Sequence, residues 1–321
     1  MSRSTLAICI PAYNAAEFLP RLLGSVNAQT VKFDEVWVYD DFSTDQTAKV
    51  AQELGARVVR GEVNRGCATG RNALAEQASC DWLHFHDADD ALHPTFVERA
   101  RLWMEQGDAP DIVLFGYEER DHETGVKSDE RTYDDAALRR DAVEYTISKQ
   151  VQSICGIYRR DLFLKAGGYD LHPEVLYNED VAMHCRMARA GLKFAADHAV
   201  TVINYRRSNS MSSANQYKCS RAQYHVMSKA VAELGGRYND EIAKRLWQIA
   251  AASASYLDWE NADACVSLAT SLSGRVPAGS GRLFRLLCGV SPHAAIRIRE
   301  KLIRMLKPTL RTNHTAAPEI V

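Results

Sequence analysis

The sequence predicts an α/β fold: a doubly wound, mostly parallel sheet in the first half, followed by a C-terminal helical region. Short apolar runs typical of buried strands alternate with helical patterns up to about residue 117, and their connections are short. From about residue 216 onward, strand propensity is low and helical patterns dominate. With 321 residues, 46% of them hydrophobic and 25% charged, the chain is long enough to bury a core in roughly two domains.

The first half contains five predicted strands, at residues 6–10, 36–39, 57–59, 82–85 and 112–115. The first helix between them begins near Glu17, because Pro20 fits only a first turn. We expect Ser43 to cap the second helix, with Gln46 as its capping-box partner and Gly55 as its end. Further helices are predicted at 68–78 and 96–105.

The alternation ends after about residue 118. Residues 118–135 are rich in Glu and Asp, which predicts a loop. Strands are predicted at 151–158 and 199–206, on either side of a helix at 179–191. The last third is predicted to contain helices such as 224–234, 243–257 and 294–306.

Charge and cysteine usage argue against several classes of protein. The 39 Lys and Arg residues are balanced by 41 Asp and Glu residues, a formal net charge of −2, so we expect no nucleic acid partner. No run of about 18 apolar residues is present, and the run at 6–10 is too short for the core of a signal peptide. The eight cysteines are scattered without a C-x-x-C pair, which indicates buried thiols in a cytoplasmic chain.

Polar residues follow three of the predicted strands: Tyr13 and Asn14 after the first, Asp40 and Asp41 after the second, and Asp87 and Asp89 after the fourth. In a doubly wound sheet, ligands bind at the carboxyl ends of the strands. The three sets of side chains therefore predict a ligand site at one edge of the sheet.

The segment 87–90, Asp-Ala-Asp-Asp, is a candidate metal site. Carboxylates at alternate positions can present oxygens to Mg²⁺ or Mn²⁺, and a bound cation removes their mutual repulsion. Alternatively, the segment is a solvated loop that caps the helix after Pro94. His84 and His86 point to one face of their strand, where structural histidines are favoured over a zinc site.

Two further segments are candidates for nucleotide contacts. The Asp41 carboxylate can accept the imide N–H of a uracil or the hydroxyls of a ribose, while Ser43 and Asp45 serve the following helix. Residues 64–72 lead into a helix whose N-terminus, with Arg71, could hold phosphate oxygens or could be an ordinary loop. Its spacing is neither a P-loop nor G-x-G-x-x-G, which argues against ATP or NAD.

Glu179 and Asp180 open a later helix. The helix dipole favours carboxylates in a first turn for structural reasons alone. The functional alternative is that one of them takes a proton from an acceptor hydroxyl.

Taken together, these motifs resemble family 2 glycosyltransferases with the GT-A fold. The resemblance covers about residues 4–212 and rests on six motifs in order: Pro11-Ala12-Tyr13-Asn14, Asp40 to Asp45, Asn64-Arg65-Gly66 with Arg71-Asn72, Asp87 to Asp90, Arg159 through Gly167-Gly168-Tyr169-Asp170, and Glu179-Asp180. It implies a GT-A domain over 1–215, with a nucleotide-binding half at about 1–117 and an acceptor half at about 118–215. Residues 216–321 would then form a helical region with a basic tail.

The resemblance also implies an activity and the residues that carry it. The activity is the inverting, non-processive transfer of one hexosyl or N-acetylhexosaminyl unit from a nucleoside-diphosphate sugar, with UDP favoured, to a glycan or lipid-linked acceptor of a bacterial surface glycan. The implied nucleotide contacts are Pro11, Ala12, Tyr13, Asn14, Asp41, Arg71, Asp87 and Ala88. Asp89 would hold Mn²⁺ or Mg²⁺, Asp180 would be the general base, and Glu179, Asp90 and Arg206 would support the site or the acceptor. A non-catalytic sugar-nucleotide-binding module and a nucleotidyltransferase are the alternatives.

The chain departs from the family pattern at two positions. Phe42 replaces a usual Gly, so we expect a differently shaped loop under the nucleotide. Ser208 replaces the His of a Tyr-Arg-x-His stretch, here Tyr205-Arg206-Arg207-Ser208, so a metal or diphosphate role there is not expected to carry over. The Gln-x-x-Arg-Trp motif of processive synthases is missing, which indicates one sugar added per encounter.

The C-terminal tail is basic, with nine Lys or Arg residues and one acid, Glu300, between Arg275 and Arg311. Ile296, Ile303 and Leu306 form an apolar side near Arg297, Lys301 and Arg304. This pattern suits a solvated helix packed on its domain, and alternatively a helix on the anionic cytoplasmic face of the inner membrane.

Overall fold

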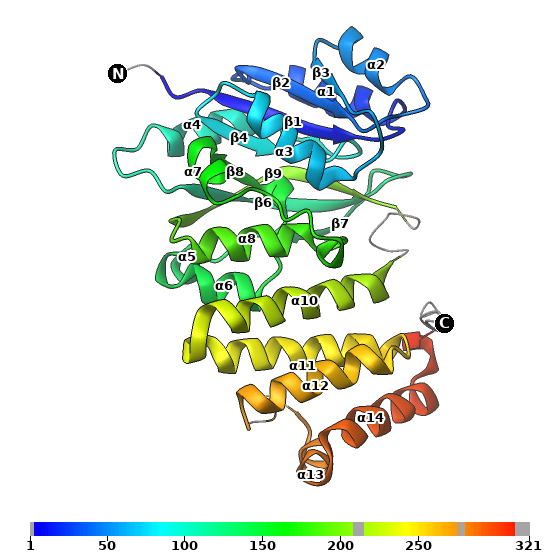
Figure 1. The fold of residues 1–321 in the computed structure, drawn as a ribbon. Coiled ribbons are helices and arrows are strands. Elements are labelled where there is room, and N and C mark those ends of the chain that lie inside the picture. The colour runs from blue at the N-terminus through cyan, green and yellow to red at the C-terminus, as the bar shows by residue number, and fades with distance from the viewer. Residues whose placement is uncertain (1–2, 208–214, 275, 277–279, 312–321) are drawn as a thin grey trace. The chain divides into compact units, whose positions relative to one another are not determined.

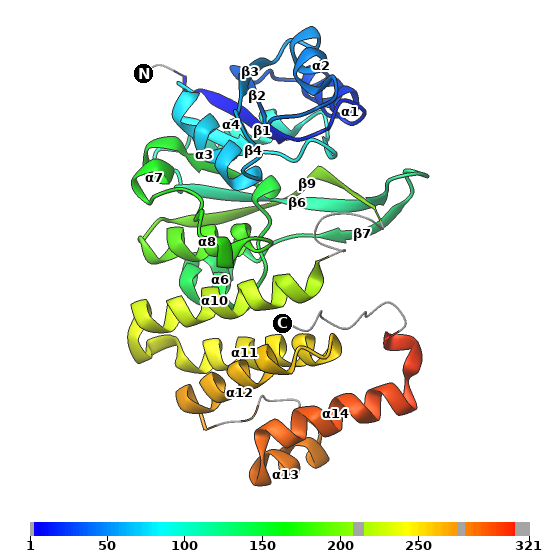
Figure 2. The same cartoon turned by 45° about the vertical axis from the view of Figure 1, so that its right-hand side comes forward.

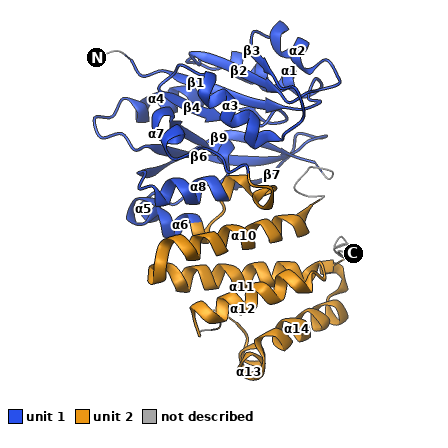
Figure 3. Cartoon of the chain, in the orientation of Figure 1, with its two compact units in different colours: residues 1–146, 151–171, 182–210 blue, residues 147–150, 172–181, 211–321 orange. Residues whose placement is uncertain are grey.

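The computed structural model describes residues 3–207, 215–274, 276 and 280–311. Its residues form two compact units, coloured separately in Figure 3. The first unit comprises Met1–Thr146, Val151–Leu171 and Ala182–Ser210, and the second comprises Ile147–Gln150, His172–Val181 and Met211–Val321. Residues 172–181, which precede and open a helix, therefore belong to the second unit.

The first unit is built on one sheet with strand order β3-β2-β1-β4-β8-β6-β9-β5, and β7 pairs with β6 (Figure 1). The strands are β1 (Leu6–Ala12), β2 (Glu35–Asp40), β3 (Arg57–Arg60), β4 (Trp82–Phe85), β5 (Ala91–Leu92), β6 (Ile112–Asp121), β7 (Lys127–Arg131), β8 (Gly156–Arg159) and β9 (Phe194–Arg206). Strands β3, β2, β1 and β4 pair in parallel, whereas β8 runs antiparallel to both β4 and β6. The α/β fold class is confirmed, and the parallel pairing predicted for the first half holds among these four strands.

Four helices connect the strands of the parallel half: α1 (Leu19–Asn27), α2 (Thr47–Glu53), α3 (Cys67–Gln77) and α4 (Phe96–Met104). The helices lie where the sequence predicts them, because apolar residues such as Leu19, Leu22 and Val26 are spaced to share one buried helix face. The predicted cap of the second helix is wrong. Gln46, not Ser43, is the N-cap residue of α2, since the Ser43 hydroxyl accepts the N–H of Asn14 instead.

The second half of the sheet differs from the prediction at residues 118–135. Strand β6 continues to Asp121 and turns into β7, so a charged hairpin replaces the expected loop, as Figure 2 shows. Glu118 is buried and pairs with Arg120 and Lys127, which compensate its negative charge. These charged residues have low strand propensity, so the sequence alone does not predict the hairpin. The segment predicted as a strand at 151–158 begins with a 3-10 turn at Ser153–Cys155, and β8 follows it.

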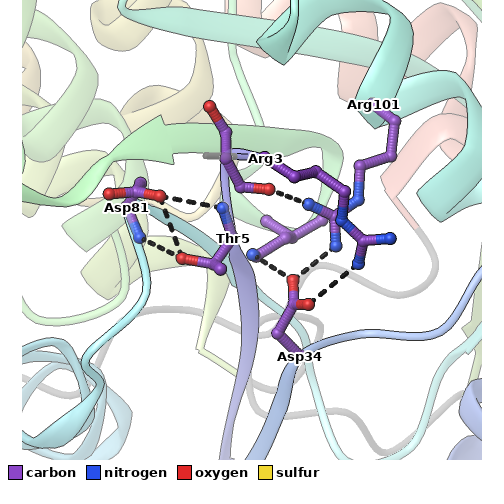
Figure 4. Close-up of polar contacts among 7 residues, drawn as sticks. Arg3, Thr5, Asp34, Asp81 and Arg101 are labelled. Carbon is purple, nitrogen blue, oxygen red and sulfur yellow. Dashed lines mark hydrogen bonds and ion pairs between the residues drawn. The ribbon is translucent and has the colours of Figure 1, made fainter. Parts of the chain in front are cut away.

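The first strand is anchored at its N-terminal end by two carboxylates, drawn in Figure 4. Asp34 accepts the N–H of Leu6 and pairs with Arg3 and Arg101, while Asp81 accepts the N–H and hydroxyl of Thr5. Burial raises the pKa of Asp34, but hydrogen bonds from Leu6 and Arg101 outweigh it and hold that pKa below its usual value. These contacts fix the register at which β1 enters the sheet.

Further helices complete the first unit, and another set builds the second. Those of the first unit are α5 (Asp135–Arg140), α6 (Ala142–Ser148), α7 (Arg160–Lys165) and α8 (Glu179–Arg189), of which α6 ends and α8 begins with residues of the second unit. Those of the second unit are α10 (Gln216–Leu234), α11 (Asn239–Ser255), α12 (Trp259–Leu272), α13 (Arg282–Val290) and α14 (Pro292–Leu306). Small buried residues such as Ala250 and Ala262 let α11 and α12 pack closely. The helical prediction for the last third is confirmed.

Candidate functional site

The loops after β1 and β2 are joined by hydrogen bonds at the carboxyl ends of these strands. Asn14, with a positive φ of 47°, donates its N–H to the Ser43 hydroxyl (2.9 Å), and its side-chain oxygen accepts the N–H of Thr44 (2.9 Å). Pro11 and Ala12 are buried in β1, whereas the Tyr13 ring is about half exposed. The two loops therefore form one rigid rim that presents Tyr13 to solvent.

Asp41 is fixed on this rim. Its side chain is buried, and its two carboxylate oxygens accept the N–H groups of Arg65 (2.9 Å) and Gly66 (2.7 Å). Each carboxylate oxygen has more than one lone-pair position, so Asp41 can accept a further donor from a ligand. The contacts also tie the end of β2 to the residues that lead into α3.

Phe42 adopts a φ of 64°, the left-handed conformation that glycine takes without strain. The sequence predicts a differently shaped loop at this departure from the family pattern, and that stays a prediction. The chain keeps a glycine-like conformation and places a half-exposed aromatic ring there.

Arg71 links α3 to the turn after β4. Its guanidinium is buried, lies over the Tyr169 ring at 5.1 Å and donates to an Asp87 carboxylate oxygen at 2.5 Å. Gly70 lets α3 pack closely on β2, because a Cβ at that position would lie 2.8 Å from the Tyr39 ring. Arg71 thus reaches the acidic turn through Asp87, and its contact with a nucleotide stays a prediction.

The turn Asp87 to Asp90 concentrates negative charge. Asp90 is buried and accepts the N–H of Tyr205 (2.7 Å) and the side-chain amide of Asn204 (2.9 Å). Burial raises the pKa of Asp90, and the neighbouring charges of Asp89 and Asp87 raise it further. A cation close to this turn would relieve that repulsion, and oxygen donors are those that Mg²⁺ and Mn²⁺ prefer. The residues present therefore fit a divalent metal site.

In the structure, arginines supply the positive charge around this turn. The guanidinium of Arg207 is ion-paired with the Asp89 carboxylate and lies over the Phe18 ring at 4.4 Å. Arg21 donates to the backbone carbonyl of Asp89 (2.6 Å) and lies 3.8 Å from the centre of the Tyr205 ring. Asp89 is partly exposed, and a metal ion would have to displace Arg207 from its carboxylate.

Arg207 and Arg21 were not among the residues predicted for the site. Arg206, which was, pairs with Glu119 at 2.7 Å, whereas the next residue along the chain reaches Asp89. Alternation along the strand predicts that Arg206 and Arg207 point to opposite sides, but it does not identify Asp89 as the partner of Arg207. Nothing in the sequence around Arg21 indicates its contact with Asp89. The prediction for Ser208 falls outside the described residues.

The two histidines below the turn are structural. His84 and His86 are fully buried, and the two rings share a hydrogen bond of 3.0 Å. His84 Nδ1 must be protonated, since its partner at 2.8 Å is the carbonyl oxygen of Gly156. Burial lowers the pKa of His84 to about 4, so the ring is neutral at pH 7. This agrees with the structural reading of the pair rather than a zinc site.

Glu179 and Asp180 occupy the first turn of α8, as the sequence predicts. Both belong to the second unit, so the structure describes them apart from the turn at Asp87 to Asp90. Glu179 is buried and Asp180 is half-buried. The role of each carboxylate stays a prediction.

Comparisons with known proteins agree with this fold. A family model described as "Glycosyl transferase family 2" matches residues 7–167. An uncharacterized glycosyltransferase of Haemophilus influenzae is 35% identical over 102 residues, which is 32% of this chain and only 35% of that relative. Among solved structures, S. aureus TarS 1–349 in complex with UDP-GlcNAc superimposes with a TM-score of 0.71 at 19% identity, covering 94% of this chain and 92% of TarS. The mannosyltransferase PcManGT of Pyrobaculum calidifontis, in complex with GDP-Man and Mn²⁺, gives a TM-score of 0.61 at 17% identity, covering 98% and 85%.

Proposed function

This chain belongs to glycosyl transferase family 2, and from that premise we propose that it moves one sugar from a nucleoside-diphosphate sugar to an acceptor hydroxyl with inversion at the anomeric carbon. The observation that carries the proposal is the turn Asp87 to Asp90. The turn follows β4, which pairs in parallel with β1, and its carboxylates are paired with Arg71 and Arg207. Paired cations and carboxylates at strand ends suit a ligand that combines a metal ion with phosphates.

The nucleotide would lie on the rim formed by Pro11 to Asn14 and Asp41. Tyr13 offers an exposed ring against which a base can stack, and Asp41 can accept an imide N–H or a ribose hydroxyl. Arg71, Asp87 and Ala88 would complete the contacts near the ribose and diphosphate. We favour a uridine nucleotide, because Asp41 can accept the imide N–H of uracil and TarS, which shares the fold, was solved in complex with UDP-GlcNAc.

Asp89 is the proposed ligand of Mn²⁺ or Mg²⁺, with Asp87 beside it. When bound, the metal neutralises the charge that develops on the departing diphosphate. Arg207 must then leave the Asp89 carboxylate, and its guanidinium becomes available for phosphate oxygens. Asp90, buried and hydrogen-bonded to Asn204 and Tyr205, holds the turn in shape.

Asp180 is the proposed general base. A half-buried carboxylate at the start of α8 can accept the proton of an acceptor hydroxyl as that oxygen attacks the anomeric carbon, while Glu179 and Arg206 support the acceptor side. A single displacement of this kind inverts the anomeric centre. The acceptor is proposed to be a glycan or a lipid-linked precursor of a cell-surface glycan, on the cytoplasmic side of a membrane.

The test measures nucleoside diphosphate release with a panel of UDP-, GDP- and dTDP-sugars, with and without Mn²⁺, in the parent chain and in Asp180→Asn. We expect metal-dependent release with a uridine donor. Loss of the base should lower kcat by about 10²–10⁴-fold while donor binding persists. Asp161→Asn is the matched control, because Asp161 is an exposed acid in the first turn of α7.

Two outcomes would replace the proposal with its alternatives. No release above the protein-free background by either the parent or Asp180→Asn, while the donor still binds, indicates a non-catalytic sugar-nucleotide-binding module. Release of pyrophosphate from a nucleoside triphosphate and a sugar phosphate indicates a nucleotidyltransferase.

A further inference from the structure

Helix α13 exposes a row of large apolar side chains. Leu283, Leu286 and Val290 are 61%, 72% and 89% exposed, and their i, i+3, i+7 spacing places them on one face of the helix. The opposite side of the apolar sector is covered, since Cys288 is buried and the Phe284 ring meets the Trp247 ring at 6.0 Å. Helix α13 is therefore held by one apolar face and leaves a second one open to solvent.

The neighbouring helix continues this apolar surface. Near the C-terminal end of α14, Met305 and Leu306 are 67% and 74% exposed. Ile296, which the sequence places on the same apolar side, is instead buried within the unit, so the open surface lies farther along the chain than the sequence predicts. Helices α13 and α14 lie next to each other in both views of the chain (Figures 1 and 2).

The two helices border an open groove of about 640 Å³. Its walls are mainly apolar, with Leu283, Leu287 and Leu302 among them, and Arg299 and Lys307 lie at its border. The groove could receive an unbranched hydrocarbon chain next to two cations, an arrangement that matches an anionic lipid.

The basic residues of this region divide into two groups. Arg304 and Arg311 share the buried Glu300, and Arg297 pairs with Asp263, so these three side chains are engaged within the unit. The structure records no ion pair, among the residues it describes, for the others: Arg282, Arg285, Arg299, Lys301 and Lys307. Arg282 and Arg285 are exposed on α13 beside the apolar row, one helical turn apart. An apolar face bordered by unneutralised cations is typical of a helix that lies in a membrane interface.

We propose that α13 and the C-terminal part of α14 bind the surface of an anionic bilayer, with Leu283, Leu286, Val290 and Met305 entering the interface and the unpaired cations contacting lipid phosphates. No helix among residues 3–207, 215–274 and 280–311 is long and apolar enough to cross a membrane, so the contact is peripheral. The inference deepens the proposed function by naming the surface that would bring the chain to a lipid-linked acceptor. It is tested without turnover, so its failure would leave the transferase proposal standing.

The experiment is flotation of the full-length chain with two kinds of vesicle: phosphatidylcholine alone, and phosphatidylcholine with about one third phosphatidylglycerol. We expect binding to the anionic vesicles only, weakened when NaCl is raised from about 0.1 M to about 0.5 M. Leu283→Ser/Leu286→Ser/Val290→Ser should lower the bound fraction about tenfold or more, and Arg282→Ser/Arg285→Ser should lower it severalfold. All five side chains are exposed, so these variants should keep their circular dichroism and melting temperature.

Matched controls change exposed residues of the same kinds elsewhere. Leu102→Ser/Val126→Ser removes two exposed apolar side chains, and Lys149→Ser/Lys165→Ser removes two exposed cations. Both should bind vesicles as the parent does. The proposal is overturned if the parent chain stays unbound, or if the triple serine variant floats like the parent. It is also overturned if light scattering shows a dimer that the triple variant dissociates while neither binds vesicles, because the surface would then join two copies of the chain.

Discussion

Replacing Arg207 with glutamine should tighten the binding of Mn²⁺ to the chain in the absence of nucleotide. In the structure, the Arg207 guanidinium is ion-paired with the Asp89 carboxylate, which is the oxygen donor proposed for the metal. Two cations cannot both occupy this position, so Mn²⁺ must first displace Arg207. Glutamine keeps most of the side chain's length and removes its charge.

The size of the effect follows from the exposure of the pair. The side chains of Arg207 and Asp89 are 33% and 27% exposed, so the pair is neither fully exposed nor fully buried. Its strength should lie between that of a surface pair, up to about 1 kcal/mol, and that of a buried charged hydrogen bond, roughly 1.5–3 kcal/mol. The Phe18 ring under Arg207 adds about 0.5 kcal/mol to the present arrangement. A total of about 1–2 kcal/mol corresponds to a metal dissociation constant roughly 5–30 times lower in Arg207→Gln.

Electron paramagnetic resonance of free Mn²⁺ measures this dissociation constant directly. Arg206→Gln is the matched control, because the neighbouring arginine pairs with Glu119 and its loss should leave metal affinity unchanged. Equal or weaker Mn²⁺ binding in Arg207→Gln would refute the reasoning, since it would mean that Arg207 does not compete for Asp89.

Three further predictions concern the scaffold around the site. The free energy of unfolding should fall by up to about 3 kcal/mol as the pH drops from about 6.5 to 4, because the unfolded chain binds a proton at His84 that the folded chain, with a pKa of about 4, does not. Urea unfolding at several pH values should show a flatter pH profile for His84→Gln, and an unchanged slope would contradict this. Phe42→Gly should raise the free energy of unfolding by up to about 1 kcal/mol by relieving the strain of the left-handed backbone, whereas Phe42→Ala should bring no gain. Equal melting temperatures for the two variants would show that backbone strain at this position does not lower stability. Asp34→Asn should lower the free energy of unfolding by about 2–4 kcal/mol, because Arg101 is left buried with one fewer charged partner. Asp129→Asn, at an exposed pair with Arg131, should lower it by less than about 0.5 kcal/mol. Denaturant titration compares the two variants, and similar losses of stability would argue against the anchoring role of Asp34.

The strands and the acidic turn were predictable because their signals are local. β1, β2 and β4 are short, mainly apolar strands that end at Ala12, Asp40 and Phe85, and parallel pairing brings their carboxyl ends to one edge. The acids that follow these strands, Asp41 and Asp87 to Asp90, can be identified from the sequence in the same way. A single sequence therefore predicts which strand ends carry the site.

Features that depend on distant partners were not predictable. The hairpin of β6 and β7 consists of charged residues with low strand propensity, and it forms because β6 is held by pairing with β9. Arg207 lies 118 residues from Asp89 in the sequence, and only the register of β9 brings them together. Ser43 has the spacing of a helix cap, but Asn14 uses its hydroxyl instead.

The most direct test of the account is a crystal structure of the chain with its nucleoside-diphosphate sugar and Mn²⁺, with the metal located by anomalous scattering. We predict an Asp89 carboxylate oxygen within about 2.5 Å of Mn²⁺, diphosphate oxygens on the same ion, and Arg207 released from Asp89. Manganese bound away from Asp87 to Asp90, or Asp89 still paired with Arg207 beside a bound donor, would contradict the proposed site.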